Sequence, residues 1–505
     1  MTNHVVAYSR ENGGRVLLLF LLFFMAMYQF ITAGFPAFVI VCLFPFIVLF
    51  VYFTFKWRMF AFWTLILINY FVQMKDFPIP GPKSMLTEML QLLLLAIAIM
   101  DARKNPHFEK CINLMLFALI IWCTFCTLEV LNDTCGLGIN ITAWYTGARL
   151  MAFQLLYIFL VFSIYISSPE TLIRYLKLWA ILSLFSALWT WKQQNIGLTS
   201  AENSFLYGQG RVTHIIQGGT LIRYFSTFSD AASYGCNAAA SAIAFLIFGI
   251  TTKVKKNKWF FILIAILVVK SMFASGTRTA IFCMAGGFAV YIVLSKTFKI
   301  AVPAMIIGGF LLFILAFTKI GNGNQQIRRM RSAFDKSDAS ANARDINKET
   351  MRKYMKDAPW GIGIGMMSNN VPANNKYNLM ASIPTDSEYV NIWLRTGKIG
   401  ITIFILTMLM MFGGACYIVF FKLNNLSLIG IGGGLCSAFV AIQLGGYANQ
   451  ILMQFPNCLT FYGGLTIVYL LPYLEPAWIE YEKKQLTIQE EKKRIKLEKK
   501  LAERV

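Results

Sequence analysis

Long apolar runs separated by short polar segments repeat along almost the whole chain. From about residue 16 to residue 474, runs of roughly 17–25 apolar residues recur, and each is long enough to cross a hydrocarbon core of about 30 Å as a helix. The sequence lacks the alternating ten-residue strands typical of an outer-membrane barrel. The pattern therefore predicts an all-α, polytopic membrane bundle of about 12–14 transmembrane helices. The expected spans lie near residues 16–33, 35–55, 59–74, 85–100, 111–131, 148–167, 173–192, 230–250, 259–275, 279–295, 300–318, 397–421, 427–448 and 452–474.

One long polar segment interrupts this pattern between two apolar runs. It covers residues 319–395 and separates a first membrane part, residues 1–318, from a second, residues 396–475. The charged stretch 476–505 is expected to be a cytoplasmic helix near anionic head groups. A polar segment of this size between spans is where we expect a membrane protein to carry its chemistry.

Composition agrees with a membrane environment. The chain is 57% hydrophobic and 14% charged, whereas soluble domains contain about 25% charged residues. The net charge of +22 is compatible with nucleic-acid binding, but most Lys and Arg residues lie in short loops between apolar runs. That placement is typical of topology determinants. We therefore expect a multi-pass protein of the cell (inner or plasma) membrane and no nucleic-acid partner.

The same basic loops predict the orientation of the bundle. Lys- and Arg-rich short loops fall on one side, together with the basic tail, so this side and both termini are expected in the cytoplasm. The first apolar run has no small-residue cleavage site after it and is interpreted as an uncleaved anchor. Three polar segments then converge on the outer face: residues 193–229, the turn Ser275–Arg278 and the large extracytoplasmic loop 319–395.

Arginines at the expected outer ends of spans are candidates for anion binding. Arg278 lies in ASGTRTAIF and Arg223 begins RYFSTFSD, where an outer loop meets a span. A guanidinium carries a permanent charge and a donor fork that matches phosphate oxygens. The alternative for both residues, and for Arg149 in WYTGARLMAFQ, is an arginine that only anchors the helix end at the interface.

Two carboxylates follow the large loop. Asp386 and Glu388 lie in PTDSEYVNIW, just before the chain re-enters the membrane, and either could accept a proton from an attacking hydroxyl group. The alternative is a helix N-terminus, with Thr385 or Asp386 as the N-cap and Glu388 in the first turn. No further acidic cluster joins them in sequence, so we expect no metal site and no cofactor.

Three other patterns have structural alternatives. The CxxC of Cys123 and Cys126 lies within a span and fits helix packing better than zinc or redox chemistry. The chain has three histidines, and the outer-loop His214 belongs to no Ser/His/Asp or zinc pattern. The glycines of PWGIGIGM, residues 361–365, indicate either flexible backbone near a substrate or a helix-to-loop transition.

In order and spacing, these motifs resemble the O-antigen polymerase and O-antigen ligase superfamily of integral-membrane glycosyltransferases. The resemblance runs from about Trp144 to Tyr469. It includes WYTGARLMAFQLLY, WKQQNIG, LIRYFSTFSDAASYG, ASGTRTA, ARDINKETMRKYMKDAPWGIGIGM and TDSEYVNIWLRTGKIG.

The resemblance implies a type-C glycosyltransferase-like bundle that polymerises undecaprenyl-diphosphate-linked oligosaccharides into O-antigen, capsule or exopolysaccharide. It implies catalytic roles for Arg223 and Arg278, with Glu388 or Asp386 as the base. It implies substrate-binding roles for Arg149, Gln194, Arg344, Tyr389 and Arg395. Expected partners are the lipid-linked oligosaccharide and membrane lipids, with a flippase and a chain-length regulator as further candidates.

Two alternatives remain open. Ligases of this family usually carry His-Asn where this chain has TDSE, which favours a polymerase over an O-antigen ligase. A flippase or exporter of lipid-linked sugars would place charges deep in several spans, whereas this sequence collects them at the expected outer face.

Overall fold

The computed structural model describes residues 13–502, except for segments 77–82, 102–107, 217–220, 297–301 and 332–338 and several positions between 304 and 316. Helices make up most of the described chain, and a two-residue antiparallel pair, β1 (Ile215–Ile216) and β2 (Leu221–Ile222), lies in one loop. The helices are α2 (Gly13–Lys56), α3 (Met59–Phe71), α4 (Lys83–Asp101), η1 (Phe108–Cys111), α5 (Leu114–Leu128), η2 (Glu129–Leu131), α6 (Ile141–Ala148), η3 (Arg149–Phe153), α7 (Gln154–Tyr165), α8 (Pro169–Asn195), α9 (Ser200–Tyr207), α10 (Arg211–His214), α11 (Ala231–Thr251), α12 (Lys255–Ala274), α13 (Thr279–Leu294), α15 (Gln325–Arg331), α16 (Ala339–Tyr354), η5 (Met355–Asp357), α17 (Asn378–Ser382), α18 (Glu388–Tyr417), η6 (Ile418–Lys422), α19 (Leu426–Ala448), η7 (Cys458–Tyr462) and α20 (Gly463–Ala502).

Nine helices in the described part of the chain are long and apolar enough to cross a membrane. They confirm the predicted all-α, multi-pass membrane class. Shorter apolar helices at Leu17–Thr32, Phe44–Lys56, Met59–Phe71 and Thr279–Leu294 match four further expected spans. The expected span 300–318 lies largely outside the described residues.

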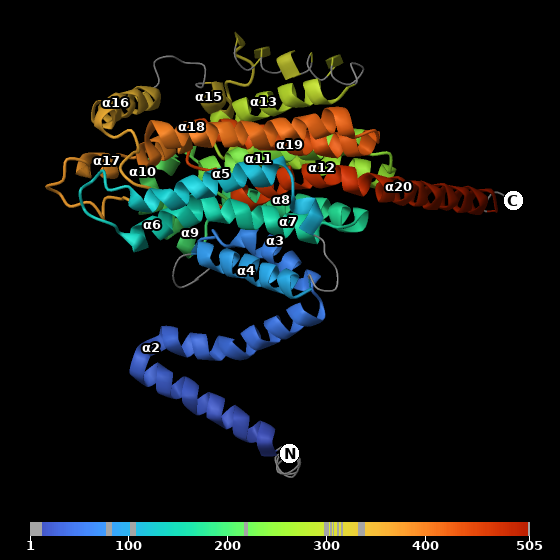
Figure 1. Cartoon of the computed structure of the whole chain (residues 1–505). Coiled ribbons are helices and arrows are strands. Elements are labelled where there is room, and N and C mark those ends of the chain that lie inside the picture. The colour runs from blue at the N-terminus through green and yellow to red at the C-terminus, as the bar shows by residue number, and fades with distance from the viewer. Residues whose placement is uncertain are drawn as a thin grey trace.

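Two helices each continue across a boundary at which the sequence pattern divides the chain. α2 contains the first two expected spans, bent at Gly34 where φ is 79°, and its N-terminal part reaches away from the bundle (Figure 1). α20 continues from the last expected span into the charged tail without a break and contains Pro472 and Pro476. In Figure 1 its C-terminal part projects beyond the bundle. The tail is therefore a continuation of a membrane helix.

The centre of the bundle is formed by α11 and α19, whose residues are mostly buried. Both helices are rich in Gly, Ala and Ser, and such small residues let helices approach closely in a membrane. A Cβ added to Gly287 of α13 would lie 3.0 Å from the carbonyl oxygen of Ser437 in α19. A side chain at this position would therefore keep α13 and α19 further apart.

Polar segments that lie far apart in the sequence meet at one end of the bundle. The backbone N–H of Tyr224 donates to the carbonyl of Ala274 (3.3 Å), which joins the 193–229 segment to the turn after α12. Helix α15 of the large loop packs against α12, and its Arg329 lies near Arg223 of the 193–229 segment. The three polar segments that were expected to converge therefore lie at the same end.

The opposite end is organised around the carboxylate of Glu482 in α20. It accepts hydrogen bonds from Asn425 (3.2 Å) and Ser427, and Lys253 forms an ion pair with it (3.0 Å). Lys253 and Asn425 come from the α11–α12 and η6–α19 connections, and Ser427 lies in the first turn of α19. The two ends of the bundle thus differ: the end at Glu482 holds short connections, and the end at Arg223 holds the long polar segments.

The loop after η5 packs on a bend in α18. Gly397 has φ of 67° and divides α18 into a short N-terminal part and a long apolar part. The N–H groups of Ile362 and Gly363 donate to the carbonyls of Leu394 and Arg395, each at 3.0 Å. A Cβ on Gly361, where φ is 81°, would lie 2.4 Å from the carbonyl carbon of Arg395. The glycine triplet therefore serves close backbone packing.

Substituting Gly361→Ala is expected to destabilise the protein by at least about 2 kcal/mol, because alanine disfavours positive φ and its Cβ would clash with backbone. The unfolding midpoint in detergent, followed by fluorescence-detected gel filtration, measures the effect. Gly323→Ala is the control, because no atom lies within 4 Å of a Cβ at that position. Equal midpoints for the two variants would contradict this account of the loop.

Candidate functional site

Arg223 lies against the turn that connects α12 to α13. Its Nε donates to the carbonyl of Ser275 (3.2 Å), one terminal nitrogen donates to Thr277 Oγ1 (3.1 Å), and the other to the carbonyl of Thr213 (2.9 Å). These bonds use three of the five N–H donors of a guanidinium. The two sequence motifs RYFSTFSD and SGTR are thus one structural unit, with the cation of the first fixed on the turn of the second.

Two further arginines lie near Arg223. Burial and the positive charges of Arg329 and Arg278 together lower the pKa of Arg223 to about 10, while Asp230 opposes the shift. Arg329 comes from α15, which packs against α12. Because like charges gather here, an anion would be stabilised by them, and an anion with several oxygens most of all. Arg223, Arg278 and Arg329 are referred to below as the arginine cluster.

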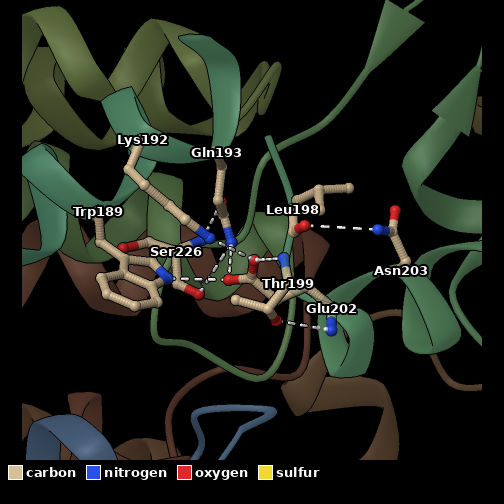
Figure 2. Close-up of polar contacts among 8 residues, drawn as sticks. All are labelled: Trp189, Lys192, Gln193, Leu198, Thr199, Glu202, Asn203 and Ser226. Atoms are coloured by element: carbon tan, nitrogen blue, oxygen red, sulfur yellow. Dashed lines mark hydrogen bonds and ion pairs between the residues drawn. The ribbon is translucent and has the colours of Figure 1, made fainter. Parts of the chain in front are cut away.

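The loop that carries Arg223 is held by a buried carboxylate (Figure 2). Glu202 is 1% exposed and accepts hydrogen bonds from Trp189 Nε1 (2.8 Å), Gln193 Nε2 (2.6 Å) and the backbone N–H of Thr199 (2.8 Å). Lys192 forms an ion pair with it at 3.3 Å. Burial raises the pKa of this carboxyl, but the hydrogen bonds and the lysine outweigh burial, so the pKa lies below its ordinary value.

Gln193 connects Glu202 to the segment that carries Arg223. Its side-chain oxygen accepts from the backbone N–H of Ser226 (3.0 Å), and the Ser226 hydroxyl donates to the carbonyl of Ser186 (2.6 Å). Ser226 has φ of 53°, a conformation that costs a non-glycine residue about 1–3 kcal/mol. The two bonds to α8 hold this conformation three residues after Arg223.

His214 and Asp230 cap the start of α11, next to the same loop. Asp230 accepts from the N–H groups of Ala232 and Ser233, each at 2.8 Å, and His214 Nε2 accepts from the N–H of Ala231 (3.1 Å). Nδ1 of His214 lies 3.1 Å from the carbonyl of Gly210. Burial and the charge of Arg223 lower the pKa of His214 to about 4, although Asp230 opposes the shift. The imidazole is therefore neutral at pH 7 and acts as a helix cap.

Lys75 adds a further cation beside this cap. Its Nζ donates to the carbonyl of Ser229 (2.8 Å) and lies 3.7 Å from the ring centroid of Phe205. Burial lowers the pKa of Lys75 to about 8, while Asp230 raises it. The ammonium thus joins the α3–α4 connection to the segment that ends in Asp230.

The two candidate carboxylates have different surroundings. Glu388 is 4% exposed and accepts from the backbone N–H of Leu452 (3.1 Å). It lies in the first turn of α18, but the N-cap is Ser387, so the expected capping role of Thr385 or Asp386 is wrong. Asp386 is exposed and lines a surface pocket. Glu388 therefore supports the packing of the 449–457 loop, and Asp386 is the carboxylate that a ligand can reach.

The first part of α18 also carries Arg395 and Tyr389. Arg395 donates to Asn391 Oδ1 (2.9 Å) and to the carbonyl of Ile364 (3.1 Å), so it joins α18 to the glycine-rich loop. The Tyr389 hydroxyl donates to Gln443 Oε1 (2.9 Å) in α19. Both predicted substrate-binding residues thus have protein partners, and their direct contact with substrate stays a prediction.

The connection between α19 and η7 joins the arginine cluster to the carboxylates. Asn449 Nδ2 donates to Thr279 Oγ1 (3.4 Å), directly after Arg278. The neighbouring Gln450 hydrogen bonds to Thr385, directly before Asp386. The cationic turn and the acidic segment therefore contact two consecutive residues of one loop.

The remaining predicted residues lie in different settings. Arg149 is 7% exposed and pairs with Glu88 of α4 at 2.6 Å, so a carboxylate already balances its charge within the bundle. Gln194 is exposed, whereas its neighbour Gln193 makes the bonds to Glu202 and Ser226. The side chain of Arg344, in α16, lies outside the described residues. Among the residues that the structure describes, no group of three His, Cys, Asp or Glu side chains is arranged to hold a metal ion.

Sequence reasoning did not single out Glu202, Gln193 or Arg329. A signal for Glu202 was present, because TSAE is a capping-box pattern and Thr199 and Glu202 form that box at the start of α9. Arg329 lies in the basic run RRMR, which follows the polar stretch GNGNQQI. Gln193 and Gln194 differ by one position on α8, and only the helix register distinguishes the buried one.

Residues 264–405 match a family model described as O-antigen ligase. The matched region contains the Ser275–Arg278 turn, α15, the large loop and the first part of α18, and it confirms the resemblance to the O-antigen polymerase and ligase superfamily. No curated protein matches the chain. The match supports a role in processing lipid-linked glycans and implies a glycosyltransferase-like enzyme of the membrane.

Substituting Glu202→Gln is expected to destabilise the protein by about 1–3 kcal/mol, because buried donors lose a charged acceptor. It should also reduce activity by loosening the loop of Arg223. Thermal unfolding in detergent and a cellular glycan assay measure the two effects. Asn203→Ala is the control, since this exposed residue makes one long bond to Leu198 (3.4 Å). Unchanged stability in Glu202→Gln would contradict the anchoring role.

Acidification is expected to destabilise this end of the bundle through His214. The ordinary histidine pKa is about 6.5 and the folded value is about 4, so between these values the unfolded chain binds a proton that the folded chain does not. Stability is therefore lost as pH falls through this window, by about 2 kcal/mol at pH 5. Unfolding midpoints at pH 7 and pH 5 measure the loss, which should shrink in His214→Gln. The same pH sensitivity in both proteins would exclude His214 as its source.

Proposed function

We propose that the protein is a glycosyltransferase that polymerises undecaprenyl-diphosphate-linked oligosaccharide repeat units at the outer face of the cytoplasmic membrane. The product would be an O-antigen, a capsular polysaccharide or an exopolysaccharide. The observation that carries this proposal is the arginine cluster at the loop-bearing end of a membrane bundle, with Arg278 and Arg329 inside the region that matches the O-antigen ligase family. A diphosphate at a membrane surface is the anion that such a cluster fits best.

The proposed reaction exchanges one bond to the anomeric carbon for another. A hydroxyl oxygen of the acceptor glycan attacks the anomeric carbon of the donor, and the bond from that carbon to the diphosphate oxygen breaks. The hydroxyl proton passes to a carboxylate, and the carrier-lipid diphosphate leaves with the bonding electrons. Fixed donors aimed at the developing charge typically contribute about 3–4 kcal/mol each, which is the role we assign to Arg223 and Arg278.

Asp386 is the base that the geometry favours. It is exposed beside a pocket, so an acceptor hydroxyl can reach it, whereas the carboxylate of Glu388 is buried against the N–H of Leu452. We therefore assign Asp386 a catalytic role and Glu388 a positioning role. No metal or cofactor is part of the proposed reaction.

An O-antigen ligase is the second candidate, because the matching family is described by that activity. A ligase would transfer the finished glycan to another acceptor with the same diphosphate chemistry. The polymerase is favoured because TDSE stands where ligases usually carry His-Asn. For either enzyme we propose that both termini are cytoplasmic and that a flippase supplies the donor. For the polymerase, a chain-length regulator would complete the pathway.

Arg278→Ala should abolish the polysaccharide ladder of the cell surface. Loss of one such donor lowers a rate about 10²–10³-fold, and Arg278→Lys should restore only part of it, since an ammonium lacks the donor fork. The measurement is a gel of surface polysaccharide from a deletion strain that carries each variant, with protein amounts checked by immunoblot. The deletion alone should leave single repeat units on their anchor.

Arg328→Ala is the matched control, because this exposed arginine of α15 is next to Arg329 in sequence but outside the arginine cluster. It should give the wild-type ladder. Long chains that remain on the carrier lipid in the deletion strain would establish the ligase instead. A full ladder from Arg278→Ala would remove the arginine cluster from the mechanism.

A further inference from the structure

We infer that a pocket between α16, the start of α18 and the end of α19 binds a sugar of the acceptor glycan, an inference that rests on the proposed function. The pocket is a shallow hollow of about 50 Å³ that is open to the surface, and its lining includes the side chains of Asn347, Lys348, Asp386 and Tyr447. A sugar ring would therefore lie against this lining with one face towards solvent.

The lining has the chemistry that recognises hydroxyl groups. Asp386 accepts hydrogen bonds, the amide of Asn347 both donates and accepts, and the Thr385 hydroxyl does the same. Tyr447 is 66% exposed and presents an aromatic face on which the C–H side of a pyranose can pack. A sugar ring has both kinds of surface, and this pocket offers a partner for each.

The charges distinguish this pocket from the arginine cluster. Lys348 Nζ lies 5.4 Å from the Tyr447 ring centroid, and Asp386 adds a carboxylate, so one cation and one anion line the pocket. A diphosphate would meet the carboxylate here but would meet three cations in the arginine cluster. The pocket therefore suits a hydroxyl-rich ring, and the arginine cluster suits the phosphate groups.

The pocket is built from packed elements. Met351 of α16 is 1% exposed, which seats that helix on the rest of the protein. The Ser387 hydroxyl donates to the carbonyl of Gly446 (3.3 Å), which joins the start of α18 to the end of α19. Tyrosines also anchor proteins at membrane interfaces, but an anchor requires none of the polar groups around Tyr447.

The position of the pocket fits the acceptor rather than the carrier lipid. Gln450 contacts Thr385 at the pocket, and the adjacent Asn449 contacts Thr279 next to Arg278. A glycan in the pocket would therefore lie one short loop away from the arginine cluster. Asp386 lines the pocket itself, so the hydroxyl group that attacks would reach its proton acceptor inside the site.

The test measures binding without turnover. Full-length protein in nanodiscs is mixed with oligosaccharides from partial acid hydrolysis of the source strain's surface polysaccharide, and saturation-transfer difference NMR detects the bound fragments. Wild type is expected to give signals that fall at least tenfold in Tyr447→Ala and persist in Tyr447→Phe. Tyr473→Ala is the control, because this exposed tyrosine lies on α20, away from the pocket.

Each outcome decides the question. Signals that disappear in Tyr447→Ala and persist in the other two variants support the pocket. Absence of signals from wild type, or equal signals from Tyr447→Ala, would overturn it, and a tyrosine that only anchors the protein in the membrane predicts the second result. Failure of the proposed function is recognised separately, because a deletion strain that keeps its ladder and leaves no chains on the carrier lipid disproves glycan transfer whatever the binding signals show.

Discussion

The buried carboxylate of Glu202 determines where the arginine of the candidate site can lie. Burying a carboxylate is costly unless hydrogen bonds and an opposite charge compensate it, and here Trp189, Gln193, Thr199 and Lys192 supply both. Because Gln193 also binds the backbone of Ser226, the carboxylate fixes a strained segment that begins with Arg223. The guanidinium of Arg223 extends from this fixed backbone and is bonded to Ser275, Thr277 and Thr213, so it is oriented before any anion arrives and binding need not order it.

Short connections join Arg223 to the other parts of the site. Arg223 binds the turn before Arg278, and the residues after that turn contact the loop at Asn449. The next residue of this loop contacts Thr385, beside Asp386. The turn of Arg278 and the segment of Asp386 therefore lie on separate elements, and each contacts one of two consecutive residues of this loop.

The bilayer explains what the sequence alone could predict. A hydrocarbon core of about 30 Å sets the length of each apolar run, so the positions of the spans follow from the sequence. Alternation of the spans then places residues 193–229, the Ser275–Arg278 turn and the large loop at one end. The partners of individual side chains cannot be predicted in this way. Arg149 pairs with Glu88, which is 61 positions away in the sequence, and no local pattern indicates that pair. The sequence likewise does not distinguish Gln193 from Gln194, since a one-residue step at the end of α8 decides which amide is buried.

The two halves of glycosyl transfer place opposite demands on the protein. The leaving diphosphate needs cations that keep their charge, and Arg223 with a pKa of about 10 remains protonated at neutral pH even beside other arginines. The attacking hydroxyl needs a group that can gain a proton and that the acceptor can reach. Asp386 meets this second demand at an exposed pocket, whereas Glu388 is committed to the backbone of Leu452. The arginines and the aspartate therefore meet the two demands from separate parts of the chain.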